Sequence, residues 1–390
     1  RGLVAGLLLL ELCRVRPLVV LGARVLGWAA SPGAGAAGRL VLAALRRTAF
    51  RHFCGGERLE DCAAVAGRLL SAARVRCIVD WSVEEDEGAH EENARRKAEI
   101  LRRAARELGP SAAFLPVKLT ALVPPGLLER LSAAVAAGEA GWRGRLGAED
   151  GALADAALGR LRGLCVEARA CGVPLLLDAE QSDRQPAVHL LAAELQREFN
   201  SGGAAVVYDT VQMYLRAAPE RLERGLAAAR AGSYAYAVKL VRGAYIQQEL
   251  PRGTVHASKA ATDEAYDAAL SRLLGCIAAP GGGPAAAVVV ATHNRASVEW
   301  ATAEMARLGV GRGDPRVHFA QILGMVDNLT NALGLAGYNA SKLVVFGEVR
   351  EVMPWLLRRV EENRDAFAAQ ASELPVVRRE VRRRLGLAAS

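Results

Sequence analysis

The sequence is short of cysteine pairs and of aromatic residues, and each shortage excludes a class of protein. Its seven cysteines are odd in number, scattered, and never spaced as a C-x-x-C pair. We therefore expect neither a disulfide framework nor a zinc site. We also expect the protein to lie in a reducing compartment. Aromatic residues make up only 5%, and no basic stretch is interleaved with them as single-strand binders require. Despite a net charge of +8, we expect no nucleic-acid partner.

Several catalytic signatures are also missing. The histidines do not pair at metal-ligand spacing, and no H-E-x-x-H, G-x-S-x-G or P-loop occurs, so no metal site is expected. One literal G-x-G-x-x-G spans residues 33–38. A dinucleotide fingerprint must follow a strand, and residues 28–32 make a poor one. We interpret the motif as an alanine-rich linker.

Long apolar runs are absent as well. The run Leu3–Leu12 is broken by Glu11 and followed by Arg14 and Arg16, which makes it too short for a membrane span. It favours an amphipathic helix lying on the rest of the protein or on a membrane surface. Residues 1–74 are predicted to form an N-terminal helical arm, and residues 371–390 a C-terminal helical tail. Because the chain begins at Arg1 rather than Met, we expect its targeting peptide to be absent from this sequence.

From residue 76 short apolar runs alternate with amphipathic helical stretches. Strands that are buried on both faces read as continuous apolar runs. Eight such β-then-α units without a dinucleotide turn predict an α/β fold, a closed (β/α)8 TIM-like barrel over residues 75–370. The eight runs are Cys77–Trp81, Phe114–Leu122, Val173–Ala179, Ala205–Val211, Ala235–Val241, Ala287–Ala291, Val317–Ile322 and Leu343–Phe346.

Polar residues stand at the ends of most of these runs. Catalytic groups of such barrels come from the C-terminal ends of the strands and the loops that follow. Any one buried charge could equally be a structural ion pair, but so many at similar positions indicate a shared polar site. They are Lys118, Asp178, Glu180, Gln212, Lys239, Arg242, Thr292, His293 and Gln321.

Arg358 and Arg359 lie on the last helical stretch, with Glu362 one turn beyond Arg358. Glu362 can pair with Arg358 along the helix and orient its guanidinium. Paired guanidiniums bind carboxylates in a forked geometry; on their own they would equally fit an exposed basic stripe. Since lysines and arginines outnumber the inward carboxylates of the predicted site, we expect an anionic substrate.

Five collinear motifs resemble the proline dehydrogenase family, most closely its plant and algal mitochondrial members. The resemblance covers roughly residues 40–385. The motifs are Lys118-Leu119-Thr120, Asp178-Ala179-Glu180, Lys239-Leu240-Val241-Arg242-Gly243-Ala244-Tyr245, Ala291-Thr292-His293-Asn294 and Arg358-Arg359-x-x-Glu362-Asn363.

The resemblance implies a distorted (β/α)8 barrel that holds FAD and oxidises L-proline to Δ1-pyrroline-5-carboxylate. It also implies that electrons pass to a quinone, with peripheral association at the matrix side of the mitochondrial inner membrane. Lys118, Arg358 and Arg359 would hold the substrate carboxylate. Glu362 would brace the arginines, and Tyr245 would lie against the substrate ring.

The remaining implied roles concern the flavin. Asp178 would lie near the substrate, and Lys239 near the reactive edge of the flavin, where both would act as catalytic residues. The residues implied to line the FAD are Ala179, Gln212, Lys239, Arg242, Gly243, Ala244, Thr292 and His293.

Two positions depart from the family. Many proline-specific members carry tyrosine where this chain has Leu343, members that prefer hydroxyproline carry a small residue there, and Trp355 replaces a usual tyrosine. A hydroxyproline dehydrogenase of the same family is therefore an alternative. Two other classes stay open: a Schiff-base lyase using Lys118 or Lys239, and a catalytically silent metabolite-binding barrel.

Overall fold

Eight parallel strands close into a barrel in this computed structural model, which describes residues 22, 24–29, 31–81, 90–138, 141–279, 286–362, 378–379 and 382–383. Strands β2 to β9 are neighbours in chain order, and β9 pairs back to β2. The predicted (β/α)8 barrel is thus confirmed. The strands are β1 (Cys54–Gly56), β2 (Arg76–Trp81), β3 (Ala112–Val117), β4 (Leu175–Leu177), β5 (Val207–Gln212), β6 (Tyr236–Val241), β7 (Ala286–Ala291), β8 (Val317–Ile322) and β9 (Ala340–Phe346).

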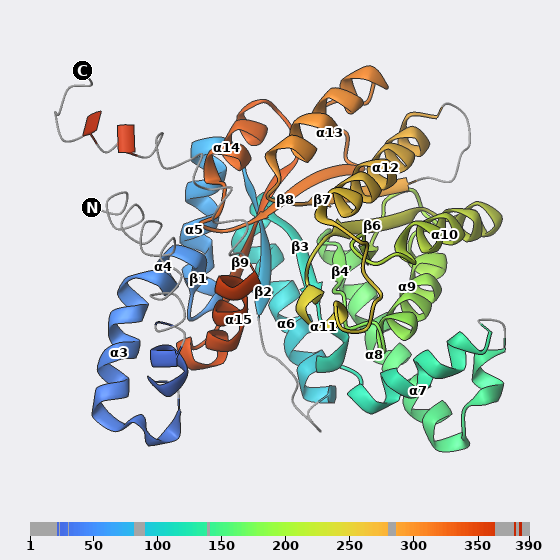
Figure 1. Cartoon of the computed structure of the whole chain (residues 1–390), viewed down its shortest axis with the longest axis horizontal. Helices are drawn as coiled ribbons and strands as arrows, with labels where there is room; N and C mark the ends of the chain where they lie inside the picture. The colour runs from blue at the N-terminus through green and yellow to red at the C-terminus, as the bar shows by residue number, and fades with distance from the viewer. Residues whose placement is uncertain are drawn as a thin grey trace.

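Helices surround the strands on the outside of the barrel (Figure 1). Several begin where the sequence provides a cap: the Asn294 side chain accepts hydrogen bonds from the first backbone N–H groups of α13, as an N-cap residue does. The helices are α3 (Gly35–Arg47), α4 (Ala49–Phe53), α5 (Leu59–Ala73), α6 (His90–Leu108), α7 (Pro125–Ala136), α8 (Ala148–Cys171), α9 (Gln185–Phe199), α10 (Ala218–Gly232), α11 (Ile246–Glu249), α12 (Lys259–Ala278), α13 (Arg295–Arg307), α14 (Asp327–Leu335) and α15 (Val349–Glu362).

The structure differs from the predicted elements in three places. The third strand ends at Val117, and the chain then turns through a 3-10 helix, Leu119–Ala121. Strand β1 was not predicted, because three residues that include Gly55 and Gly56 carry no strand pattern; it pairs with β9. Helix α7 was missed because Pro125 reads as a helix breaker, although proline is tolerated in the first helical turn.

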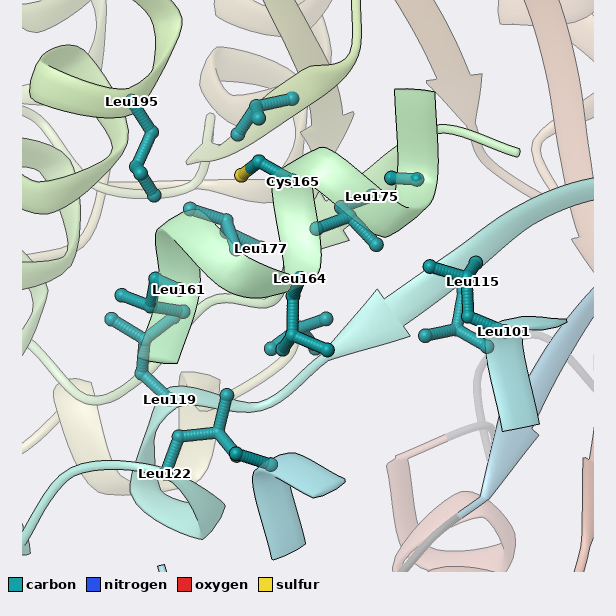
Figure 2. Close-up of a cluster of buried hydrophobic side chains, with 14 of the residues drawn as sticks. Leu101, Leu115, Leu119, Leu122, Leu161, Leu164, Cys165, Leu175, Leu177 and Leu195 are labelled. Carbon is teal, nitrogen blue, oxygen red and sulfur yellow. The ribbon is translucent and has the colours of Figure 1, made fainter. Parts of the chain in front are cut away.

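The core has an inner and an outer layer. Inside the barrel, Ile78, Phe114, Leu176 and Tyr208 belong to one buried cluster. A larger cluster lies between the strands and the helices. Figure 2 shows part of this outer layer, where leucines of β3, β4, α6, α8 and α9 meet around Cys165. Full burial of each leucine stabilises the fold by about 1.5–3 kcal/mol.

Two polar side chains, Arg76 and His318, lie at the N-terminal end of the barrel interior. An Arg76 guanidinium nitrogen lies 3.3 Å from His318 Nδ1, and His318 Nε2 lies 2.9 Å from the Pro315 carbonyl oxygen. The Phe114 ring meets the imidazole edge-on. Burial, with Arg76 nearby, lowers the pKa of His318 to about 4. The imidazole is therefore neutral at physiological pH, donating from Nε2 and accepting at Nδ1.

The N-terminal segment, residues 31–56 with helices α3 and α4, lies beside α15, as Figure 1 shows. Phe50 and Phe53 of α4 share a buried cluster with Met353 and Trp355 of α15. The start of α15 is also tied to the turn just after β1, because the Val349 N–H donates to Glu57 Oε1 over 3.3 Å. The segment before β1 therefore covers one face of the last helix.

Helix α5, by contrast, lies in the outer layer of the barrel. Its Leu59 and Cys62 belong to the same buried cluster as Val79 of β2. Among the described helices, we find none with the length and apolar character needed to cross a bilayer.

Candidate active site

The alternation of the strands builds a polar layer above the apolar interior. Side chains two residues apart in a strand point to the same face. Ile78 and Ala237 belong to the interior cluster, so Asp80 and Lys239, two residues further along, also face the interior. Gln212 follows Tyr208 by four residues on the same face. These polar groups stand at the C-terminal ends of their strands, where barrel enzymes place their chemistry.

Two residues that directly follow strands join this layer. Lys118 lies between β3 and the 3-10 turn, and Asp178 follows β4, held by a 3.0 Å hydrogen bond from its N–H to the Val117 carbonyl oxygen. The structure therefore brings Lys118, Asp178, Gln212 and Lys239 to one rim of the barrel.

Lys239 and Asp178 form a direct ion pair between β6 and the end of β4. Their side chains are 15% and 29% exposed, so both charges are largely removed from water. A partly buried charge is costly without a partner. The contact fixes the position of the Lys239 side chain at the mouth of the barrel.

A second, deeper pair was missed by sequence reasoning. Lys97 Nζ of α6 lies 3.8 Å from Asp80 Oδ1 and donates to the carbonyl oxygens of Trp81 and Pro116. Burial raises the pKa of Asp80 and lowers that of Lys97, and each partner's charge opposes the shift. The signal was present, since Asp80 is a carboxylate inside an apolar run.

Glu180 lies behind this rim and is 1% exposed. It accepts a 3.0 Å hydrogen bond from Thr120 Oγ1. Burial raises the pKa of its carboxyl, while the charge of Lys118 works in the opposite direction. Glu180 therefore connects the loop after β4 to the turn after β3.

Gln212 and Tyr245 are joined by a chain of hydrogen bonds. Tyr214 donates its hydroxyl to Gln212 Oε1 over 2.7 Å and accepts from the Tyr245 N–H over 3.1 Å. The Tyr245 hydroxyl donates to the Ala179 carbonyl oxygen over 3.1 Å, and Gln212 Nε2 donates to the Glu180 carbonyl oxygen over 2.8 Å. The loops after β4, β5 and β6 are thereby fixed to one another.

Arg242 is held by three polar partners and one ring. Its guanidinium contacts Asp263 over 2.6 Å and the hydroxyls of Thr292 and Ser297 over 2.9 Å each. It lies 4.0 Å from the centre of the Tyr266 ring. The loops after β6 and β7 are thus brought together at Arg242 and Thr292, two of the residues expected to line a cofactor.

His293 and Gln321 lie in different environments. His293 Nε2 accepts a 3.1 Å hydrogen bond from the Ile322 N–H, which assigns the ring proton to Nδ1. Gln321 accepts at Oε1 from Thr330 of α14. Its strand position matches that of Phe319, which packs in the outer layer, so Gln321 faces the helices and not the barrel interior.

The remaining predicted residues lie on β9 and α15. Leu343 borders both the interior cluster and the cluster of the N-terminal segment, whereas Trp355 is buried in the latter. Arg358, Arg359 and Glu362 belong to helix α15, but their side chains lie outside the described part of the structure.

The charges at the rim are more evenly matched than the sequence suggested. Lys239 and Arg242 each contact a carboxylate, and Lys97 faces Asp80. Among the described side chains these cations therefore carry little uncompensated charge toward a ligand. A net preference for an anion would have to come from the other cations near the rim, Lys118 and the two arginines of α15.

Comparison with known proteins decides which family has this arrangement. The family model described as proline dehydrogenase matches residues 65–371. This chain belongs to the proline dehydrogenase family. It is accordingly a member of a family of oxidoreductases of proline catabolism.

The relatives of this chain include proteins named hydroxyproline dehydrogenase and proteins named proline dehydrogenase. Hydroxyproline dehydrogenase of Mus musculus is 33% identical over 98% of this chain and 91% of its own length. Proline dehydrogenase 2, mitochondrial, of Arabidopsis thaliana is 30% identical over 89% of this chain and 80% of its own. The proline dehydrogenase family thus contains relatives of this chain with two different names.

Solved structures support the fold. Proline utilization A from Bdellovibrio bacteriovorus superposes with a TM-score of 0.68 at 20% identity, over 84% of this chain. This chain spans only 34% of the length of that protein. The comparison therefore shows that the two share the barrel fold.

Proposed function

We propose that this chain catalyses the FAD-dependent oxidation of L-proline to Δ1-pyrroline-5-carboxylate. The observation that carries the proposal is the partly buried Lys239–Asp178 ion pair at the C-terminal mouth of the barrel, in a chain that belongs to the proline dehydrogenase family. A fixed ammonium at this rim can orient a flavin and a zwitterionic substrate. Orientation of reacting groups contributes several kcal/mol to barrier reduction.

Substrate binding is assigned to the cations around this pair. Lys118 follows β3 at the rim, and Arg358 and Arg359 lie on the helix that follows β9. Two guanidiniums and an ammonium suit a carboxylate, because charge-assisted forked hydrogen bonds are strong and directional. Glu362 would brace the arginines along the helix.

Tyr245 is assigned to the ring end of the substrate. Its hydroxyl is held by the Ala179 carbonyl oxygen, so its ring has a fixed orientation beside Asp178. Apart from the carboxylate, the ring carbons of L-proline carry no polar group, and an aromatic face suits them. Asp178 would hold Lys239 and stay close to the substrate.

The residues at the mouth fit a flavin. Two buried polar atoms in the loops after β4 and β6, Gln181 Oε1 and His256 Nε2, have no hydrogen-bond partner in the described structure. A Cβ added at Gly243, whose φ is +99°, would have no neighbour within 4 Å. Buried polar atoms without partners in these two loops, and open space at Gly243, suit a polar cofactor.

When bound, the flavin would accept the hydride that leaves the substrate. The residues assigned to hold it are Ala179, Gln212, Lys239, Arg242, Gly243, Ala244, Thr292 and His293. Of these, Arg242 and Thr292 are already fixed against each other, and His293 has a defined ring proton. The protein's own contribution is position and electric field.

A Schiff-base lyase fits the rim less well. An imine-forming lysine must present its amine to the substrate carbonyl, whereas the Lys239 amine is occupied by its contact with Asp178. The family membership also favours oxidation over imine chemistry.

Hydroxyproline is the second candidate substrate, supported by the relatives of that name. Leu343 borders the barrel interior and has no hydroxyl that could recognise or exclude a hydroxylated ring. Trp355 packs with Phe50 and Phe53, so Leu343 is the better placed of the two departing residues to set ring preference. Leu343→Tyr is expected to shift preference toward L-proline; an unchanged ratio of the two kcat/KM values would remove that role.

The electron acceptor is proposed to be a quinone, reached by docking on the matrix side of the mitochondrial inner membrane. Val25, Trp28 and Leu40 are exposed, with Leu40 at 73%. Residues 22–56 contain several arginines and no aspartate or glutamate. Exposed apolar side chains with surrounding arginines suit an anionic lipid surface. Binding to anionic but not neutral vesicles, weakened in Trp28→Ser with Leu40→Ser, is the expected result.

The deciding experiment is an anaerobic titration of the purified flavoprotein. L-proline is expected to bleach the flavin absorbance band, and hydroxyproline to do so less completely or more slowly. The reverse order would assign the chain to hydroxyproline. Bound flavin that neither compound reduces would indicate a silent binding barrel, and colourless protein would contradict the cofactor assignment.

A further inference from the structure

The segment between β6 and α12 contains one buried residue, the carboxylate Glu249, among partly or fully exposed neighbours. Residues 242–258 include helix α11 and begin with the turn that carries Tyr245. Glu249, the last residue of α11, is 1% exposed, whereas its neighbour Leu250 is 51% exposed. A buried carboxylate on a surface segment requires partners.

Those partners come from two loops. Glu249 Oε1 accepts a 2.9 Å hydrogen bond from the Ser182 N–H, and Oε2 accepts one of 2.8 Å from Thr254 Oγ1. Arg252 contacts Glu249 Oε1 over 3.4 Å and reaches Asp183 over 3.0 Å. Ser182 and Asp183 belong to the loop after β4, four and five residues beyond Asp178.

The balance of interactions keeps this carboxylate charged. Burial by itself raises the pKa of Glu249, but the hydrogen bonds from Ser182 and Thr254 and the charge of Arg252 outweigh it, so the pKa lies below its ordinary value. An ionised carboxylate accepts from all of its partners at once, which a neutral amide cannot do.

The contact therefore joins two loops that both reach the candidate active site. Tyr245 lies four residues before Glu249, and the Tyr245 hydroxyl already meets the loop after β4 at Ala179. Glu249 fixes the same two loops at another point. Together with the Tyr245–Ala179 and Arg252–Asp183 contacts, the Glu249 contact restricts how the segment can rotate against the loop after β4.

We propose that Glu249 is a positioning residue that fastens the Tyr245 segment to the loop carrying Asp178, and so sets the ring wall of the substrate pocket. The inference rests on the proposed function, because it assigns Tyr245 to the substrate. Glu249 does not itself touch substrate or cofactor.

The test uses Glu249→Gln in the full flavoprotein. Glutamine keeps the shape but removes the negative charge, so the contacts from the Ser182 N–H and the Arg252 guanidinium lose their charge assistance. Loss of a hydrogen bond to a charged group corresponds to about a tenfold change. We expect the apparent Kd for L-proline, from the concentration dependence of anaerobic flavin reduction, to rise about tenfold, with flavin content unchanged.

A double-variant cycle separates positioning from general loosening. Tyr245→Phe removes the first attachment point, and if Glu249 acts through Tyr245, the combined variant should show less than the product of the two single effects. Effects that multiply would overturn the proposal. Gln248→Ala, on the exposed side of α11, is the matched control and should behave as wild type.

A readout without substrate tests the same contact. Trypsin cleavage after Arg252 should be at least about tenfold faster in Glu249→Gln than in wild type or Gln248→Ala, because the open segment is the cleavable one. If Glu249→Gln does not fold, Thr254→Val removes one hydrogen bond and should show a smaller acceleration. Equal cleavage rates would refute the attachment. Failure of L-proline to reduce wild-type flavin would refute the proposed function alone, since the cleavage comparison does not depend on it.

Discussion

Removing the carboxylate charge of Asp178 is the sharpest perturbation of the candidate site. In Asp178→Asn the Lys239 ammonium keeps its burial and loses its anionic partner. A hydrogen bond to a charged group contributes about 1.5–3 kcal/mol. Because the two side chains are 15% and 29% exposed, solvent screens part of this interaction, and we expect the lower half of that range.

A loss of about 1.5–2 kcal/mol in orientation corresponds to a rate roughly ten- to thirtyfold slower. The assay is anaerobic stopped-flow measurement of flavin reduction by L-proline, with the free energy of unfolding measured in urea alongside. Asp314→Asn is the matched control: Asp314 also binds an arginine, Arg316, over 2.7 Å, but it precedes β8 at the opposite end of the barrel.

The double variant Asp178→Asn with Lys239→Met separates stability from catalysis. Removing both charges leaves neither one unpaired, so the free energy of unfolding should recover relative to Asp178→Asn. The rate of flavin reduction should not recover. A wild-type reduction rate in Asp178→Asn would falsify the assignment of the Lys239–Asp178 pair to orientation of the reacting groups.

Three further predictions follow from single residues. Arg358→Met should raise KM for the substrate at least tenfold, because a charge-assisted forked contact is worth roughly 1.5–3 kcal/mol. Burial holds the pKa of His318 at about 4, below its value in the unfolded chain. The unfolded chain therefore binds more protons at acidic pH, and the free energy of unfolding falls as pH drops from about 6.5 toward 4. The fall is at most about 1.4 kcal/mol per pH unit. His318→Gln should flatten that slope in urea unfolding. Gly225→Ala should lower the free energy of unfolding by about 1–3 kcal/mol, because a Cβ there would collide with the Tyr236 ring. Gly159→Ala lies in open space within α8, so it should raise the free energy of unfolding by up to about 1 kcal/mol.

Each of these has a clear contrary outcome. An unchanged KM would take Arg358 out of the substrate site. If the free energy of unfolding changes equally with pH in wild type and His318→Gln, the His318 imidazole is not buried as described. Equal unfolding energies for the two glycine variants would contradict the close packing of α10 on β6.

The barrel was predictable because its signal is local and repeated. Each strand is buried on both faces, so it reads as a short apolar run whatever its partners are, and eight such runs alternate with helical periodicity. The exceptions had no local signal. Strand β1 is short and contains glycine, and its pairing depends on β9, which lies near the other end of the chain.

The candidate site was predictable in part for a similar reason. A lysine or carboxylate at the end of an apolar run stands out in the sequence, as Lys118, Asp178 and Lys239 do. Sequence could not show which charges meet. Lys97 is one of many cations on a helical stretch, and only the structure brings it to Asp80. Gln321 was expected at the shared polar site because it lies in an apolar run. Its strand position instead turns its side chain toward α14.

The sequence by itself determined the fold class and the set of polar residues at the strand ends, because burial and periodicity are written residue by residue. Only the tertiary structure decided the partners: Asp178 with Lys239, Arg242 with Thr292, and Glu249 with the loop after β4. The physical reason is that an ion pair or hydrogen bond depends on a few ångströms of distance between groups far apart in the chain. That distance is set by barrel closure and loop packing, which no local pattern encodes.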